Sequence, residues 1–505
     1  MKLQFLENEC WYGGATSWGG RMPIGKEDVC TLELCHNKTP NQAMPLFLSN
    51  KGRCLWASTG MDITFDHGEI TCPQEVILTQ AGTTLKDAYQ YAVKEYVPFS
   101  GKAPAEKLFS APIFNSWIEL TFHQTQQGIL EYAHAIVDNG FEPGVLMIDD
   151  GWSEYYGMWT FHSGRFPDPK AMLKELHSLG FSVVMWVVPY VSPDSAAYRY
   201  AMGNGYLVMQ PDGNPYLARW WNGCSAVVDL SNQQAADWLH GQFAQLMELG
   251  VDGFKFDGGD AIYAQQDNVT QKGLTPNQQC QAWCEFGQRY AFNEYRSTWL
   301  AGGMPLFQRL CDKQHSWGEN GIAALLPDTL AQGITGHPFG CADMVGGGEY
   351  LNFAACSDRL DRELFVCHSG ASCLMPAIQF SAAPWRVLTE KELKQIHRQL
   401  ELRKQYLPYL LQQIKQSAKT GEPVVRYMEY EYPNQGCERI LDQFMLGDAL
   451  LVAPVLEKGA KKRKVWIPKG SWNCRGNRIE SSGEWKEFVE ENWLPIVLEK
   501  VKTHE

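Results

Sequence analysis

The chain lacks any long run of apolar residues, although 45% of its 505 residues are hydrophobic. Charged or polar residues interrupt every apolar stretch before it reaches the roughly 18 to 20 residues that a membrane-spanning helix needs. We therefore predict no membrane-spanning helix and no membrane partner. The segment Met1–Cys10 contains two glutamates and has no apolar signal core. This favours a cytoplasmic location.

The cysteines show no pattern of metal binding. There are fifteen of them, an odd number, and no two form a Cys-x-x-Cys pair. Cys280 and Cys284 lie one helical turn apart, but no matching pair of histidines or cysteines accompanies them. We expect reduced, mostly buried thiols and no metal.

Sequence signals for nucleic acids and nucleotides are also missing. The net charge is −13, with 57 acidic and 44 basic residues, and this balance argues against a nucleic-acid partner. No Gly-x-Gly-x-x-Gly or phosphate-binding loop follows an expected strand, which disfavours dinucleotide binding. We expect no cofactor.

Short strand patterns occupy both ends of the chain. Segments 31–34 and 75–79 are examples near the N-terminus, and 444–454 and 465–468 are examples near the C-terminus. Between them, strands alternate with amphipathic helices. The sequence therefore predicts an N-terminal β-sandwich (1–108), a catalytic (β/α)8 TIM barrel (109–419) and a C-terminal β-sandwich (420–505).

The alternation in the middle region favours a parallel α/β barrel over an open doubly wound sheet. Strands are expected at 112–117, 144–150 and 181–188, and helices at 125–139, 171–179 and 233–249. Later apolar pieces, including Gly370–Pro376, are expected to complete the eightfold set. A long helix from Glu390 to about Lys419 then closes it.

Phe254–Asp260 is the segment with the most chemical information. As a strand, its period of two places Lys255 and Asp257 on one face and the two phenylalanines on the other. In a barrel, the lysine and aspartate would face the ligand at the carboxyl end. The alternative interpretation is a buried ion pair that only closes the strand.

Other expected strand ends also carry acids and tryptophans, from a chain that contains eighteen tryptophans. They are Asp149, Asp150, Trp152, Trp186, Trp220, Trp221 and Asp312. Aromatic faces beside carboxylates suit sugar rings. Retaining cleavage of a glycosidic bond needs two carboxyl groups about 5–5.5 Å apart. A cation such as Lys255 or Arg296 would keep the nucleophile ionised.

Several ordered motifs resemble glycoside hydrolase family 31, within the branch that contains the myogenesis-regulating glycosidase and bacterial α-galactosidases. The resemblance runs from about Asn115 to the end of the chain. It is carried by Phe254–Asp260 together with Phe166–Pro169, Trp220–Gly223, Asp312–Trp317, Gly336–Phe339, Ala342–Gly347, Met375–Ser381 and Met445–Val455.

The resemblance implies roles for two carboxylates. Asp257 matches the family's nucleophile at the end of the fourth barrel strand. Asp312 matches the acid/base, because Trp317 follows it and Arg296 precedes it at the spacing of a family tryptophan and a sugar-binding arginine. Glu319 is the alternative acid/base.

The resemblance also implies a set of residues that bind the sugar. Asp149 matches an acid of the second strand, Trp221 an aromatic wall, and Asp343 another acid of the pocket. Asp150, Trp186, Lys255 and Arg296 complete the predicted set.

The expected substrate is a terminal α-galactoside. Gln379–Ser381 replaces the Arg-x-His contact of the family's α-glucosidases. Asp149, Asp150 and Lys255 resemble the residues with which family 27 α-galactosidases read the 4- and 6-hydroxyls. Alternative substrates are α-N-acetylgalactosaminides, α-glucosides and sulfoquinovosides. Transglycosylation and a catalytically silent sugar-binding protein are further alternatives, and the sequence leaves the oligomeric state open.

Overall fold

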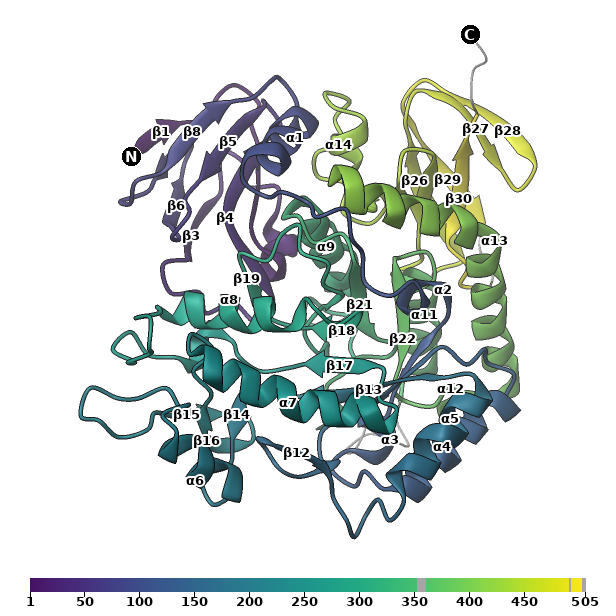
Figure 1. Cartoon of the computed structure of the whole chain (residues 1–505). Coiled ribbons are helices and arrows are strands. Elements are labelled where there is room, and N and C mark those ends of the chain that lie inside the picture. Colours follow the sequence, from purple (N-terminus) through teal and green to yellow (C-terminus); the bar gives the residue numbers. More distant parts are fainter. Residues whose placement is uncertain (352–359, 490–491, 502–505) are drawn as a thin grey trace.

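The middle region of the chain forms a closed barrel of eight parallel strands (Figure 1). The structure, a computed structural model, describes residues 1–351, 360–489 and 492–501. Neighbouring barrel strands follow the order of the chain, and the last strand pairs with the first. The strands are β9 (Ile113–Asn115), β10 (Val145–Ile148), β13 (Ser182–Val187), β17 (Gly253–Phe256), β18 (Phe292–Tyr295), β20 (Gln308–Arg309), β21 (Gly340–Met344) and β22 (Ala377–Phe380).

Helices in the connections surround these strands. Most strand residues are fully buried, as expected for a parallel sheet whose outer face packs against helices. The main barrel helices are α4 (Gln126–Asp138), α5 (Pro169–Leu179), α7 (Gln233–Leu249), α8 (Pro276–Gly287), α9 (Ile322–Ile334), α11 (Arg362–Ser372) and α13 (Glu390–Thr420). The predicted (β/α)8 barrel is confirmed.

One of the sequence-based strand predictions is wrong. Gly370–Pro376 forms no strand: it is the end of α11 followed by a turn, and the eighth strand is β22. The end of α11 is buried on all sides, so its apolar residues show no helical period. A short apolar run of this kind fits a buried strand equally well.

An insertion after β13 shapes the carboxyl end of the barrel. It contains α6 (Ala196–Gly203) and a three-stranded sheet of β14 (Tyr190–Val191), β15 (Leu217–Trp220) and β16 (Gly223–Val227). The tight β15–β16 turn carries Trp221 and Asn222.

Two sheets with a shared apolar core form the N-terminal β-sandwich. One sheet is β1 (Lys2–Gln4), β7 (Glu69–Thr71), β6 (Asp62–Asp66) and β3 (Val29–Glu33). The other is β2 (Trp11–Ala15), β4 (Gln42–Ser49), β5 (Arg53–Trp56), β8 (Ile77–Gln80) and β19 (Thr298–Trp299). Phe47 of β4 and Phe65 of β6 meet in the core, with ring centroids 5.6 Å apart. Because β19 comes from the barrel region, backbone hydrogen bonds tie the two domains together.

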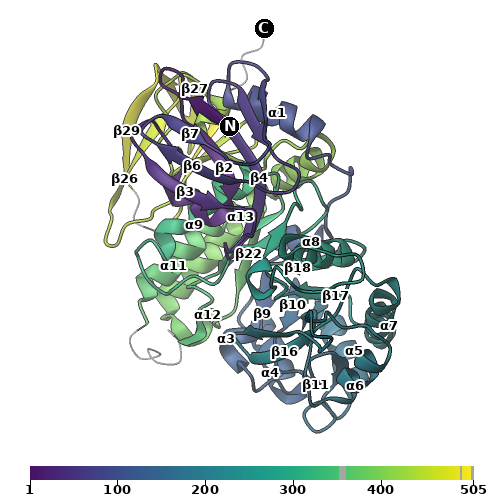
Figure 2. The same cartoon turned by 90° about the vertical axis from the view of Figure 1, so that its left-hand side faces the viewer.

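The C-terminal region is also rich in strands. Its larger sheet is β23 (Val425–Arg426), β24 (Phe444–Leu446), β25 (Leu450–Ala453), β30 (Ile496–Lys500), β27 (Gly470–Cys474) and β28 (Asn477–Ser481). β26 (Lys462–Ile467) pairs with β29 (Glu484–Val489). Figures 1 and 2 show both β domains on the same side of the barrel. The predicted fold class is confirmed; the boundaries at 108 and 419 stay predictions.

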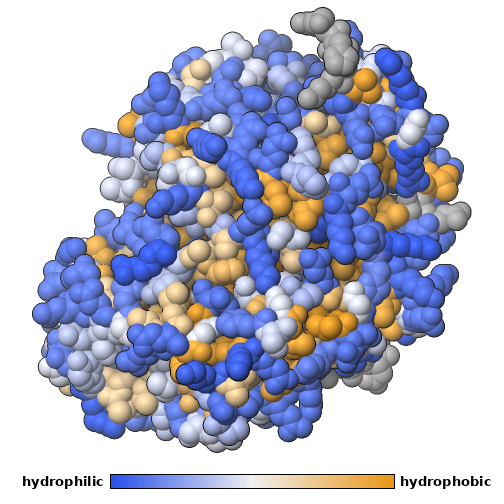
Figure 3. All heavy atoms as spheres, turned by 45° about the vertical axis from the view of Figure 1, so that its right-hand side comes forward, coloured by the Kyte–Doolittle hydropathy of each residue, from blue (hydrophilic) through white to orange (hydrophobic). Residues whose placement is uncertain are grey.

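Hydrophilic residues predominate on the face of the molecule in Figure 3, with hydrophobic residues lying among them. Within the described residues, no helix is long and apolar enough to cross a membrane. The described part of the chain also contains no cluster of three or more His, Cys, Asp or Glu residues able to hold a metal ion. Fourteen cysteines are described, and all of them are free thiols.

Candidate active site

A cavity of about 410 Å³ opens at the carboxyl ends of the barrel strands. Eight of the nine residues predicted from the sequence line it. They are Asp149, Asp150, Trp186, Trp221, Lys255, Asp257, Arg296 and Asp312. Residues that are far apart in the sequence therefore meet in one cavity, because parallel strands end at the same edge of the barrel.

Asp257 directly follows β17 and is held by donors on both carboxylate oxygens. Oδ1 accepts from Arg296 Nε at 3.1 Å and from the Gly258 amide at 2.9 Å. Oδ2 accepts from Trp186 Nε1 at 3.0 Å. Burial alone would raise the pKa of Asp257, but the positive charges of Arg296, Lys255 and Arg309 outweigh it and hold the pKa well below its usual value. Asp257 is therefore ionised at neutral pH.

Arg296 links this carboxylate to the wall of the cavity. Its guanidinium donates to Asp260 Oδ1 at 3.0 Å and to Asp260 Oδ2 at 2.8 Å, and this two-pronged contact fixes its plane. The indole of Trp221 covers the guanidinium, with the ring centroid 5.2 Å from Cζ. Trp221 is 47% exposed, so it stands at the mouth of the cavity.

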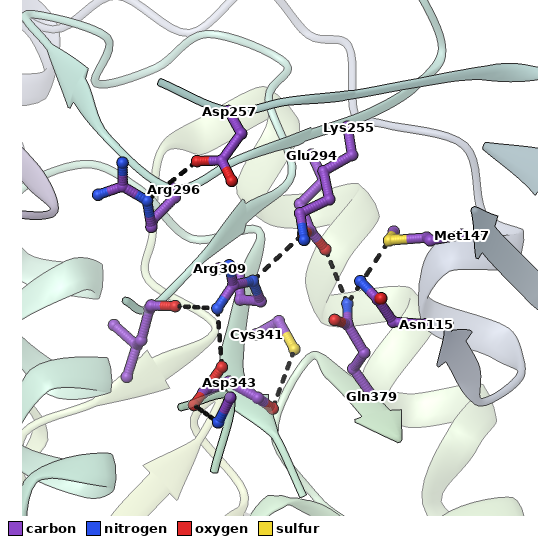
Figure 4. Close-up of polar contacts among 12 residues, drawn as sticks. Asn115, Met147, Lys255, Asp257, Glu294, Arg296, Arg309, Cys341, Asp343 and Gln379 are labelled. Carbon is purple, nitrogen blue, oxygen red and sulfur yellow. Dashed lines mark hydrogen bonds and ion pairs between the residues drawn. The ribbon is translucent and has the colours of Figure 1, made fainter. Parts of the chain in front are cut away.

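Lys255 forms a buried ion pair at the floor of the cavity. Its Nζ donates to Asp149 Oδ2 at 2.6 Å and lies 4.0 Å from Glu294 Oε1. Burial would lower the pKa of Lys255, but the charges of Asp149 and Glu294 raise it above its usual value. The lysine is thus a fixed cation in the barrel (Figure 4).

Asp150 lies beside this pair and keeps one acceptor atom unused. Its Oδ2 accepts from Asn222 Nδ2 at 2.7 Å and from the Tyr156 hydroxyl at 3.1 Å. Its Oδ1 is buried without a hydrogen-bond partner among the described residues. Burial and the neighbouring charge of Asp149 raise the pKa of Asp150 to about 7. A buried acceptor of this kind suits a ligand hydroxyl.

Asp312 follows β20, with 40% of its side chain exposed. Its Oδ1 accepts from Arg309 Nη1 at 2.7 Å. Arg309 is buried and also donates to Asp343 at 2.7 Å and to Glu294 at 3.2 Å (Figure 4). Glu319 is exposed in the loop before α9, outside the cavity. Geometry therefore brings Asp312, and not Glu319, together with Asp257.

Asp343 is the one predicted site residue that does not line the cavity. Besides Arg309, its carboxylate accepts from the backbone amides of Lys313 at 2.7 Å and Gly348 at 3.0 Å. Burial raises the pKa of Asp343 to about 6, with the charge of Asp312 acting in the same direction. The carboxylate anchors the loops around Asp312. Its predicted contact with the sugar stays a prediction.

Gln379–Ser381, which replaces the Arg-x-His contact, belongs to the barrel interior. Gln379 Nε2 donates to Glu294 Oε2 at 2.7 Å (Figure 4). Ser381 Oγ accepts from the Ile118 amide at 2.8 Å. Both side chains are fully buried. Gln379 contacts β18 across the barrel, and Ser381 contacts the short helix α3 (Trp117–Leu120).

Several residues of the cavity were not predicted from the sequence. Arg309 carried one usable signal, because it ends a barrel strand three residues before Asp312. The aromatic residues Trp117, Tyr263 and Tyr350 also line the cavity, but they lie in short helical pieces between the strands, without a regular spacing. Pro40 reaches the cavity from the N-terminal domain.

Comparisons with known proteins agree with this architecture. The Glycosyl hydrolases family 31 TIM-barrel domain matches residues 113–413. The Glycosyl hydrolase family 31 C-terminal domain matches residues 421–500.

Individual relatives are similar over most of the chain. Myogenesis-regulating glycosidase from Mus musculus is 32% identical over 418 residues, covering 80% of this chain and 58% of that protein. Alpha-glucosidase 2 from Bacillus thermoamyloliquefaciens is 24% identical over 418 residues, covering 78% of this chain and 52% of that protein. This chain thus spans little more than half the length of either relative.

The fold also matches solved structures. The family 31 dextranase from Flavobacterium johnsoniae, complexed with glucose, superposes with a TM-score of 0.83 at 19% identity. The match covers 99% of this chain and 66% of that one. With the barrel and the C-terminal domain both matched, this chain belongs to glycoside hydrolase family 31.

Proposed function

We propose that this protein is a retaining, exo-acting α-glycosidase that removes terminal α-linked galactose. The observation that carries the proposal is the state of Asp257: an ionised carboxylate, held by Arg296 and Trp186, in the same cavity as the half-exposed Asp312. One carboxylate is fixed as an anion, and the other can reach solvent. These are the two environments that a double displacement requires.

In the first step, Asp257 attacks the anomeric carbon. The bond between that carbon and the glycosidic oxygen breaks, and Asp312 gives its proton to the departing oxygen. Arg296 and Trp186 orient the attacking carboxylate, because they fix both of its oxygens. The products of this step are a free aglycone and a covalent galactosyl ester of Asp257.

In the second step, water replaces the aglycone. Asp312, now ionised, takes a proton from the water as its oxygen attacks the anomeric carbon. The ester bond breaks and Asp257 returns as a carboxylate. Two inversions give net retention of configuration.

The preference for galactose rests on the acids at the floor of the cavity. Asp149, paired with Lys255, and Asp150, with its unused Oδ1, present fixed acceptors and a fixed donor. Charged groups on rigid strands discriminate strongly between an axial and an equatorial hydroxyl, because the wrong epimer leaves them unpaired. We propose that they read the 4- and 6-hydroxyls.

A panel of 4-nitrophenyl α-glycosides tests both parts of the proposal. It contains the galactoside, N-acetylgalactosaminide, glucoside and sulfoquinovoside, each with wild type and Asp257→Asn. We expect the galactoside to have the highest kcat/KM, its first-formed sugar by NMR to be the α-anomer, and Asp257→Asn to be inactive. Equal turnover by both proteins would remove Asp257 as nucleophile. A higher kcat/KM on another sugar would replace galactose but keep the mechanism.

Added acceptor sugars separate hydrolysis from transfer. A hydrolase releases galactose at the same rate as 4-nitrophenol, whereas a transglycosylase releases less galactose and forms a new glycoside. Galactose binding to the wild type without turnover of any α-glycoside would identify a silent sugar-binding protein.

A further inference from the structure

Arg309 is bonded to more acids than its single charge can balance. Its Nη1 donates to Asp312 Oδ1 and to Asp343 Oδ1, each at 2.7 Å, and its Nε donates to Glu294 Oε1 at 3.2 Å. Arg309, Asp343 and Glu294 are buried, whereas the side chain of Asp312 is partly exposed. Figure 4 shows the arginine between Glu294 and Asp343. Three carboxyl groups therefore share one guanidinium.

The contact between Arg309 and Asp312 opposes the role proposed for Asp312. A neighbouring cation favours the ionised form of a carboxyl group. The first step of the proposed reaction needs Asp312 with its proton, because the departing oxygen has to receive that proton. An arginine acting alone would favour loss of the proton before the reaction begins. The other acids bonded to Arg309 therefore determine how much of its positive charge acts on Asp312.

The backbone at Asp343 directs this acid to the arginine. The register between β21 and β22 shifts between Cys341 and Met344. Asp343 lies within this irregularity and has a φ of 71°, in the left-handed region that non-glycine residues seldom adopt. Such an irregularity re-aims a side chain out of the regular alternation of a strand. Here it coincides with the carboxylate that accepts from Arg309.

The surroundings of Asp343 favour a negative charge at neutral pH. Besides Arg309, the backbone amides of Lys313 and Gly348 donate to its carboxylate. Burial raises the pKa of Asp343 to about 6. Above that pH the three donors face an anion, and this anion offsets part of the charge of Arg309.

Glu294 binds Arg309 through a different nitrogen from Asp312 and Asp343. Its Oε1 accepts from Arg309 Nε and lies 4.0 Å from Lys255 Nζ, and its Oε2 accepts from Gln379 Nε2 at 2.7 Å. All these contacts are made by cations or by a donating amide. Glu294 is thus a second acid that holds the guanidinium and offsets its charge, and it lies apart from the loop that follows β21.

Other titratable groups also act on Asp312. Lys313 and Asp328 form a buried pair at 2.6 Å. Burial raises the pKa of the thiols of Cys311 and Cys341, so both are neutral. The charged groups that line the cavity with Asp312 are Asp149, Asp150, Lys255, Asp257, Arg296 and Glu349. Because all of these are the same in the wild type and in variants of Asp343 or Glu294, a difference between the proteins reports the acid that was replaced.

We propose that Asp343 and Glu294 are positioning residues that act on Asp312 through Arg309. They fix the guanidinium and offset its charge, so that Asp312 keeps its proton until the leaving group takes it. In the first step the proton passes from Asp312 to the departing oxygen, and Arg309 then stabilises the carboxylate that remains. The inference rests on the proposed function, because it requires Asp312 to be the acid/base.

Two leaving groups separate this role from a merely structural one. The oxygen of methyl α-galactoside needs a proton to leave as methanol, whereas fluoride leaves α-galactosyl fluoride as an anion. The quantity to measure is the ratio of kcat/KM on the methyl galactoside to kcat/KM on the fluoride, at pH 5 and at pH 8. Both substrates carry the same sugar, so effects on galactose binding cancel. Neither leaving group contains a ring, so contacts of an aglycone do not enter.

For Asp343→Asn we expect this ratio to be about tenfold below that of the wild type at pH 8 and equal to it at pH 5. At pH 5 Asp343 is protonated in the wild type, so it is as neutral as the asparagine. Glu294→Gln should also lower the ratio about tenfold at pH 8, and it leaves the loop after β21 unchanged. This second variant decides the matter if Asp343→Asn does not fold.

Glu9→Gln is the matched control. Glu9 is a buried carboxylate bonded to a buried arginine, with Arg53 Nε 2.8 Å from its Oε1, but the pair lies in the N-terminal domain. Its ratio should equal that of the wild type at both pH values.

Two results would overturn the inference while leaving the proposed function in place. One is a ratio that falls by the same factor at both pH values, because the substitutions would then only displace Asp312. The other is a ratio at pH 8 that is unchanged in both variants. If the wild type turns over neither substrate, the proposed function is wrong, and the inference is wrong with it.

Discussion

The floor of the cavity consists of charged side chains at strand ends, whereas its rim consists of aromatic side chains in the connections that follow the strands. We define the floor as Asp149, Lys255, Asp257, Arg296 and Arg309, and the rim as Trp117, Phe122, Trp221 and Tyr350. Each floor residue is buried or nearly so and bonded to an opposite charge, while the rim residues are partly exposed.

This difference assigns different tasks to the two regions. The floor is rigid, because moving one charge would leave its partner buried and unpaired. Such a region can orient a nucleophile and bind one sugar selectively. The rim is attached to loops, which change without disturbing the barrel. We therefore expect floor substitutions to affect chemistry and stability, and rim substitutions to affect the choice of aglycone.

Asp312→Ala should give the largest loss of activity among substitutions that spare the nucleophile. We expect kcat/KM on an α-galactosyl-glucose disaccharide to fall by about two to four orders of magnitude. Activity on α-galactosyl fluoride should fall much less, because fluoride leaves without a proton. Azide should restore turnover and give galactosyl azide, since a small anion can replace the missing base in the second step. If azide restores the activity of Glu319→Ala and not that of Asp312→Ala, Glu319 is the acid/base.

Lys255→Met should have the largest effect on stability. It leaves the buried carboxylate of Asp149 without its ion-pair partner and removes one of the two cations beside Glu294, the other being Arg309. The free energy of unfolding should therefore fall by about 3–5 kcal/mol. Denaturant unfolding measures this. Lys394→Met, in an exposed pair with Glu390, is the control and should unfold like the wild type. An unchanged midpoint for Lys255→Met would mean that the floor is not held by its charges.

Asp150→Asn should change the pH dependence of activity. With a pKa of about 7, Asp150 is protonated at lower pH and loses acceptor capacity, so kcat/KM on galactosides should fall up to tenfold per pH unit below 7. The stability effect has the opposite sign. Since burial raises the folded pKa above the unfolded one, ionisation of Asp150 lowers the free energy of unfolding as pH rises from about 4 to 7.

In Asp150→Asn, neither kcat/KM nor the free energy of unfolding should show this pH dependence. The variant should also bind the sugar more weakly at pH 8. If kcat/KM falls below pH 7 in Asp150→Asn just as it does in the wild type, a group other than Asp150 causes the fall.

Trp221→Ala should have the smallest effect. It removes the ring over Arg296, and we expect kcat/KM to fall about fivefold to tenfold. Trp221→Phe should recover most of the activity. Trp485→Ala is the matched control, because Trp485 is 46% exposed and lies 5.2 Å from Lys464 in the C-terminal domain. If kcat/KM of Trp221→Ala falls by several orders of magnitude, this tryptophan acts in the chemistry as the floor residues do.

The sequence predicted the floor better than the rim, for a physical reason. Asp149 and Asp257 directly follow apolar strands, and barrel topology brings strand ends together. Arg309 was missed because its one signal, a strand end three residues before Asp312, depends on recognising the two-residue strand β20. Phe122 and Tyr350 meet only through the loops after β9 and β21, and no local pattern predicts such a contact.

The helices also differ in how well the sequence predicts them. The helix α7 has the predicted bounds of residues 233–249. It is amphipathic, and it ends at Gly250, which lies in the left-handed region with φ of 119°. The end of α11 was mistaken for part of the strand set, because its surroundings are apolar on every side. Periodicity identifies a half-buried element and fails for a fully buried one.

Trapping the covalent intermediate tests the central claim most directly. A 5-fluoro-α-galactosyl fluoride carries a good leaving group but slows both steps, so the glycosyl-enzyme accumulates. Intact-mass and peptide mass spectrometry should find one added fluorogalactosyl group on the peptide that contains Asp257, and none in Asp257→Asn. Asp267→Asn, at an exposed position ten residues later, should be labelled like the wild type. A label on another carboxylate, or turnover to the β-anomer without any label, would contradict the account.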